Sequence, residues 1–112
     1  ASLVGGWRLV DLNGAAIIPG TEITAVFGDS GNLSGSSGCN SYTTGYLTNG
    51  TGLSVGQLGG APQFCAAPPG LMEQEQLYRL VLSSASGYTV DGQQLTVRSG
   101  RGQLTFEALA GP

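Results

Sequence analysis

The chain has 112 residues, of which 20 are glycine and 10% are charged; it contains no histidine and no lysine, and its formal net charge is −3. A chain of this length holds one domain with one core. Four scattered arginines cannot supply the clustered positive charge that nucleic-acid binding requires, and no apolar run approaches the roughly 18 residues of a membrane span.

The first half of the chain alternates apolar and polar residues with a period of two, which is typical of antiparallel strands. In its first segment, Trp7 and Leu9 fall on the face opposite Arg8. Asn49-Gly50 is the signal of a tight hairpin turn. The predicted strands of this half cover residues 4–12, 17–18 (a short edge piece before a proline), 23–27, 33–35, 42–48 and 53–58.

The second half begins with Pro68-Pro69-Gly70, which ends any strand and favours a helix start. Residues 71–83 carry apolar side chains at helical spacing, and we expect Leu77, Leu80 and Val81 to face the core. A hairpin and a last strand follow, centred on residues 88–90, 95–97 and 104–106.

These segments predict a single α+β, mostly β, domain spanning residues 1–112. It is a strongly bent antiparallel sheet or incomplete β-barrel, closed by one amphipathic α-helix at about residues 71–83. The many glycines fit a sheet that curls sharply, because each one removes a side chain at a bend or bulge.

The missing residue types argue against an enzyme. Without histidine, the chain cannot build Ser–His–Asp or Cys–His catalysis or a histidine-based metal site. Glu73 and Glu75 lie two positions apart on the predicted helix and therefore diverge. No phosphate-binding loop or dinucleotide motif is present. We therefore expect no catalytic residues, no cofactor and no metal.

The two cysteines, Cys39 and Cys65, have three interpretations. A disulfide suits an oxidising compartment. It would close a loop of about 26 residues, which contributes roughly 3 kcal/mol or more to stability in the chain-entropy model. Alternatively, the two are buried free thiols packed as small apolar groups. A redox-active pair is the third interpretation, although the CxxC arrangement is absent. We expect the disulfide.

The stretch before the first cysteine, Gly35-Ser36-Ser37-Gly38, also has two interpretations. Such a loop can present backbone N–H groups to an anion. Its composition also fits a plain tight turn, which we favour.

Two functional hypotheses follow from this layout. The first is a non-enzymatic envelope or secreted domain that binds another protein or an apolar ligand where the helix meets the sheet. Its candidate binding surface consists of Trp7, Tyr42, Tyr46, Phe64 and Leu77.

The second hypothesis is a small secreted protease inhibitor that uses the loop at residues 61–70. This loop, which includes Phe64-Cys65-Ala66-Ala67-Pro68-Pro69, would be stiffened by prolines and tethered by a disulfide. Preorganisation of that kind favours tight binding.

The chain resembles the META (HslJ-like) domain family over nearly its whole length, because several short motifs of that family occur in it in the same order. They are Gly6-Trp7 with Leu9, Gly38-Cys39-Asn40-x-Tyr42, Tyr46, Gly50, Leu53-x-Val55, Cys65, Met72-Glu73-x-x-x-Leu77-x-x-Leu80, Tyr88-x-Val90-x-Gly92-x-x-Leu95-x-Val97 and Leu104-Thr105-Phe106. The family's usual Thr-x-Met-Ala-Cys is replaced here by Ala61-Pro62-Gln63-Phe64-Cys65, which predicts a different approach to the second cysteine.

The resemblance implies a bent antiparallel barrel with a helix. It also implies an extracytoplasmic bacterial protein, in the periplasm, on the outer membrane as a lipoprotein, or secreted, with a context of stress response or secretion. A lipid anchor would then precede Ala1, outside the present sequence. The family offers no established catalytic residues, so none is carried over.

Overall fold

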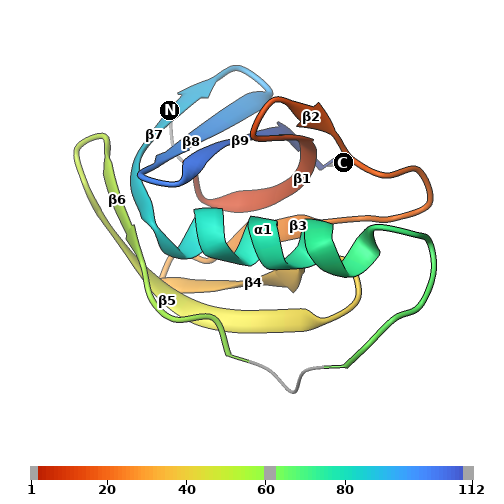
Figure 1. Cartoon of the computed structure of the whole chain (residues 1–112). Coiled ribbons are helices and arrows are strands. Elements are labelled where there is room, and N and C mark those ends of the chain that lie inside the picture. Colours follow the sequence, from red (N-terminus) through yellow and green to blue (C-terminus); the bar gives the residue numbers. More distant parts are fainter. Residues whose placement is uncertain (1–2, 60–62, 110–112) are drawn as a thin grey trace.

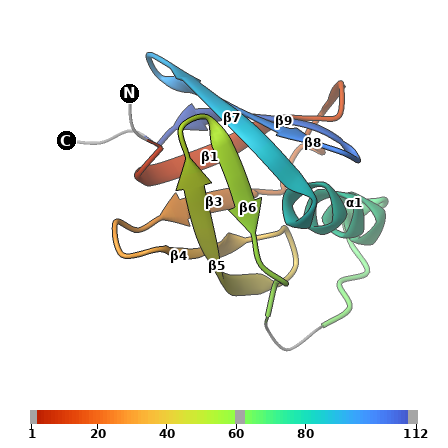
Figure 2. The same ribbon diagram turned by 90° about the vertical axis from the view of Figure 1, so that its left-hand side faces the viewer.

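A computed structural model describes residues 3–59 and 63–109, and these form an antiparallel β-barrel with one helix (Figures 1 and 2). The elements are β1 (Gly5–Leu12), β2 (Ala15–Ala16), β3 (Thr24–Phe27), β4 (Asn32–Ser36), β5 (Ser41–Asn49), β6 (Gly52–Val55), α1 (Leu71–Ser83), β7 (Ala85–Asp91), β8 (Gln94–Ser99) and β9 (Gly102–Ala108).

The sheet closes on itself through β1. Its strand order is β2-β1-β3-β4-β5-β6-β7-β8-β9, and β1 also pairs with β9, so that all strands except β2 form the closed wall. The β1–β9 register shifts between Leu9 and Asp11, where a bulge bends the strand. The predicted period of two is confirmed in β1, because Trp7 and Leu9 are buried while Arg8 is exposed.

The wall is weakest between β6 and β7. A single pair, Gly52 with Gly87, joins these strands. The N–H of Tyr88 donates to the carbonyl of Thr51 beside it, over 2.9 Å. The neighbouring ladders run along most of their strands. This seam is therefore the least supported part of the barrel.

The helix covers one end of the barrel. Figure 1 shows α1 lying across the ring of strands, and Figure 2, turned by 90°, shows it at one end, beside the lower ends of β6 and β7. It follows Gly70, whose φ of 85° suits glycine, and it spans Leu71–Ser83 as predicted. The fold class is thus confirmed.

The predicted inward face of the helix is wrong at two positions. Leu77 and Leu80 are 36% and 44% exposed, and of the three residues predicted to face the core, Val81 alone does. The buried face consists of Leu71, Gln74, Glu75, Tyr78, Val81 and Leu82. The helix turns Gln74 and Glu75 inward because polar partners from other elements meet them there.

The predicted edge piece at residues 17–18 is also misplaced. The edge strand is β2, two residues earlier, which pairs with the end of β1. The chain then leaves the sheet towards the helix, where the Ile18 N–H donates to Gln74 Oε1 over 2.9 Å.

Among the described residues, no helix is both long and apolar enough to span a membrane.

Candidate functional site

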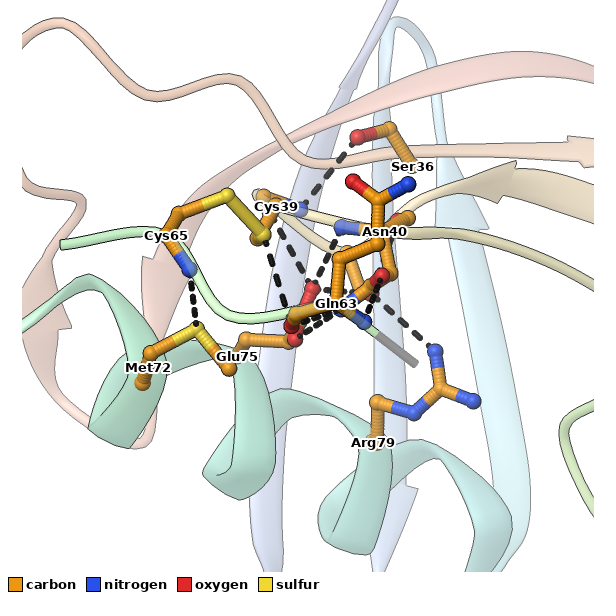
Figure 3. The surroundings of a disulfide bond; sticks show 10 residues. Ser36, Cys39, Asn40, Gln63, Cys65, Met72, Glu75 and Arg79 are labelled. Carbon is orange, nitrogen blue, oxygen red and sulfur yellow. Dashed lines mark hydrogen bonds between the residues drawn. A yellow bond between two sulfur atoms is a disulfide. The ribbon is translucent and has the colours of Figure 1, made fainter. Parts of the chain in front are cut away.

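The predicted disulfide is present. Cys39 and Cys65, which are 26 positions apart in sequence, are bonded, with 5.9 Å between their Cα atoms. Cys39 lies in the turn between β4 and β5, and Cys65 in the segment that leads to α1 (Figure 3). The free-thiol interpretation is therefore wrong.

A carboxylate from the helix binds the turn that carries Cys39. Glu75, which is 3% exposed, accepts hydrogen bonds from the backbone N–H groups of Cys39 at 3.1 Å and Asn40 at 2.7 Å. The Ser37 hydroxyl donates to the same oxygen over 2.8 Å, and the Asn40 carboxamide donates to the other oxygen over 2.7 Å. The backbone N–H groups that face this carboxylate are those of Cys39 and Asn40. The N–H groups of the Gly35–Gly38 stretch bind elsewhere: Ser36 donates to Thr24 Oγ1, Ser37 to the carbonyl of Asn40, and Gly38 to Ser36 Oγ.

This environment favours the charged form of Glu75. Burial by itself raises the pKa of the carboxyl, but the hydrogen bonds from Asn40, Ser37 and Cys39 more than offset that effect, so the pKa lies below its ordinary value. In the described residues, no ion pair joins Glu75 to Arg79. Arg79 instead donates to the Ser37 hydroxyl over 3.1 Å and to the carbonyl of Leu58 over 3.3 Å.

Asn40 also holds the loop that carries Cys65. Its carboxamide oxygen accepts from the Gln63 N–H over 2.7 Å, and its carboxamide nitrogen donates to the Gln63 carbonyl over 3.2 Å. One residue past Phe64, the Cys65 N–H donates to the sulfur of Met72 over 3.5 Å. We call the Cys39–Cys65 bond, Asn40, Gln63 and Glu75 the clasp (Figure 3).

The clasp leaves Phe64 in solvent. Its side chain is 79% exposed, the highest value among the large apolar residues of the described chain. Its two neighbours are both fixed, Gln63 by Asn40 and Cys65 by the disulfide. The backbone of Phe64 is therefore anchored on both sides while its ring is free.

Next to the clasp lies a shallow polar depression of about 450 Å³. It is lined by Ser36, Cys39, Asn40, Ser41 and Gln63. Solvent therefore reaches the Cys39 side of the disulfide.

The five residues of the predicted binding surface do not share one face. Trp7 and Tyr42 are 5% and 1% exposed, and both belong to the core, so their placement on a binding surface is corrected. They are buried because they occupy inward positions of β1 and β5. Tyr46 is also buried in the core, although one edge borders a surface cleft of about 410 Å³ beside Leu47. Leu77 is partly exposed on α1.

Comparison with known families decides the relationship. The model of the META domain matches residues 1–110. The chain belongs to the META domain family. No curated protein matches the chain.

Three solved structures share the fold of this META domain. An NMR structure of a protein from Burkholderia xenovorans is 29% identical, with a TM-score of 0.67, covering 96% of this chain and 83% of its own. A second NMR structure is 23% identical, with a TM-score of 0.75 and coverage of 93% and 88%. A crystal structure of a DUF4847 family protein from Bacteroides vulgatus is 14% identical, with a TM-score of 0.70 and coverage of 96% and 94%.

The polar half of the clasp was missed by the sequence analysis. The sequence predicts only that Glu75 diverges from Glu73 on the helix, and it predicts no contact for Asn40 or Gln63. One signal was available, because a carboxylate on α1 can satisfy N–H groups of a glycine-rich turn. The pairing itself depends on how the turn and the helix meet in space, which spacing along the chain does not show.

Proposed function

We propose that this META domain is a non-enzymatic, extracytoplasmic protein-binding domain that presents Phe64 to a partner protein. The observation that carries the proposal is the 79% exposure of Phe64 between two anchored neighbours. Aromatic residues dominate the energetics of protein interfaces. An anchored backbone also loses less conformational entropy on binding than a free loop does.

A protein partner is favoured over an apolar ligand held inside the barrel. The interior is filled by core side chains, among them Phe27, Tyr42, Tyr78 and Phe106, each at most 1% exposed. A small-molecule site needs a cavity that can take up most of the ligand's surface. The exposed ring therefore carries the binding role.

The absence of enzymatic activity is supported by the state of Glu75. Its carboxylate is already hydrogen-bonded to Ser37, Cys39 and Asn40, and its lowered pKa disfavours proton uptake at neutral pH. An extracytoplasmic location is supported by the disulfide, which persists in oxidising compartments. The family relationship favours a role in stress response or secretion.

The test uses site-specific crosslinking. Phe64 is replaced by a photo-reactive phenylalanine analogue, and Leu47 on β5, which is 76% exposed, is replaced in a matched control. After irradiation of the native extracytoplasmic fraction, we expect a discrete crosslinked protein from position 64 and not from position 47. The purified partner should then bind Phe64→Ala about tenfold or more weakly than the wild type. The same products from both positions, or none from position 64, would contradict the proposal.

A second candidate, the protease inhibitor, is favoured by one observation. Phe64, Ala66 and Ala67 are all exposed beside the disulfide, as a segment offered to a protease cleft would be. Residues 61–62 of the predicted inhibitory loop lie outside the described residues. Proteases that cleave after aromatic residues should be inhibited at micromolar concentration by the wild type but not by Phe64→Ala. Absence of inhibition by the wild type ends this candidate.

A further inference from the structure

We propose that two coupled latches hold the loop that carries Phe64, and that a dithiol reductant regulates the loop by opening one of them. The covalent latch is the Cys39–Cys65 disulfide. The polar latch is the pair of hydrogen bonds between the Asn40 carboxamide and the Gln63 backbone. Asn40 is thus a positioning residue for Phe64. Regulation of this loop affects function only if Phe64 binds a partner, so this inference rests on the proposed function above.

The polar latch is built to act without the disulfide. Asn40 meets both the N–H and the carbonyl of Gln63, as a neighbouring strand would. Glu75 fixes Asn40 in turn, through its backbone N–H and its carboxamide nitrogen, each at 2.7 Å. The Asn40 side chain is therefore oriented before the loop binds. The Cys39 sulfur lies 3.7 Å from the same Gln63 carbonyl, but a disulfide sulfur carries no hydrogen to donate, so the hydrogen bonds to Gln63 come from Asn40 alone.

The two latches are coupled because they join the same two segments. Cys39 and Asn40 are adjacent in one segment, and Gln63 and Cys65 are two positions apart in the other. Closing either latch raises the effective concentration of the groups that form the other. By linkage the effect is reciprocal, so loss of the polar latch must weaken disulfide formation by the same factor.

A dithiol can reach the covalent latch. Cys39 lines the polar depression described above, and both cysteines are partly exposed. A thiolate of the reductant attacks one sulfur, and the resulting mixed disulfide is resolved by the reductant's second thiol. The S–S bond between Cys39 and Cys65 breaks and two thiols form. The reductant supplies the two electrons and two protons and becomes a disulfide itself.

The first experiment measures the thiol–disulfide equilibrium of the folded chain in mixtures of reduced and oxidised dithiothreitol. Asn40→Ala should shift the equilibrium towards the reduced form by about fivefold or more. Gln63→Pro, which removes a single N–H donor in an exposed loop, should shift it in the same direction. Asn49→Ala, at the exposed last residue of β5, is the matched control and should leave the equilibrium unchanged.

The proposal is overturned if Asn40→Ala and Gln63→Pro both stay within about twofold of the wild type. It is also overturned if Asn40→Ala alone shifts the equilibrium, because the effect would then come from disturbing Glu75 rather than from releasing the loop.

The second experiment follows cleavage after Phe64 by chymotrypsin, detected by mass. Oxidised wild type should be cut slowest and reduced wild type faster. Reduced Asn40→Ala should be cut about tenfold faster again, because cleavage follows local opening. Equal rates for the two reduced proteins overturn the proposal. Neither experiment uses the binding partner, so failure here is distinct from failure of the proposed function.

Discussion

Two buried phenols form a hydrogen-bonded chain beneath the helix. The Tyr42 hydroxyl must donate to the carbonyl of Thr24, at 2.8 Å, because a carbonyl cannot donate. Tyr78 therefore donates to the Tyr42 oxygen over 2.7 Å. Burial raises the pKa of Tyr42 to about 12 and that of Tyr78 well above its ordinary value. Gly35 is required beside these hydrogen bonds, since a Cβ there would collide with the carbonyl oxygen of Thr24.

The direction of these hydrogen bonds makes the two tyrosines unequal. Tyr42→Phe leaves the buried Tyr78 hydroxyl and the Thr24 carbonyl without their partner, and it should lower the free energy of unfolding by about 1–3 kcal/mol. Tyr78→Phe leaves the Tyr42–Thr24 bond intact and should cost about 0.5–1.5 kcal/mol. Urea denaturation of both variants measures the difference, and an equal or larger cost for Tyr78→Phe contradicts the assigned direction.

The lowered pKa of Glu75 predicts a dependence of stability on pH. The pKa of Glu75 in the folded chain lies below its ordinary value of 4.5. At pH values between these two, the unfolded chain therefore binds more protons than the folded chain does. The stabilisation is complete above the ordinary pKa and is lost as pH falls through the folded pKa. Glu75→Gln should cost about 2 kcal/mol at neutral pH, and the gap to the wild type should narrow in acid.

Chemical denaturation at a series of pH values measures this gap. Glu73→Gln, an exposed change of the same charge in the first turn of α1, is the control and should show no such narrowing. A gap between wild type and Glu75→Gln that stays constant down to acid pH contradicts the assignment.

At the scale of the elements, the helix shows what a sequence can and cannot predict. Its bounds were predictable because Pro68-Pro69-Gly70 and the serine-rich segment after it are local signals. Its orientation was not, because the partners of Gln74 and Glu75 come from Ile18 and Asn40, far away in the chain. The helical spacing therefore predicts that Leu77 and Leu80 face the core, whereas Glu75 is the residue that is buried.

Two neighbouring leucines of α1 test this orientation. Leu82 is 0% exposed and Leu80 is 44% exposed. Leu82→Ala removes packed side-chain volume and should lower the free energy of unfolding by about 2–5 kcal/mol. Leu80→Ala, the matched control, should change it by on the order of 0.5 kcal/mol. Comparable losses in thermal or urea unfolding would contradict the observed helix face.

For the whole molecule, the strands were largely predictable and the closure was not. Local patterns predict the hairpin around Asn49-Gly50 and the one whose strands centre on residues 88–90 and 95–97, and both are present. The pairing of β1 with β9 joins the two ends of the chain, and no local pattern encodes it. The same limit explains why the cysteine pair was predicted, from residue type and compartment, while the Asn40–Gln63 contact beside it was not.

The closed wall should open first at the seam between β6 and β7. The Gly52–Gly87 pair brings no side chains across the seam, so it lacks the cross-strand packing that stabilises other ladders. β8, in contrast, pairs with β7 and β9 along its length. The Tyr88 amide, bonded to Thr51 across the seam, should therefore exchange hydrogen by local opening, at a free energy well below that of global unfolding. Amides of β8 should exchange near the free energy of global unfolding.

Native-state hydrogen exchange at increasing, low urea concentrations separates local opening from global unfolding, because local opening exposes little surface and responds weakly to denaturant. Equal protection and equal urea dependence at Tyr88 and in β8 would mean that the barrel opens as one unit.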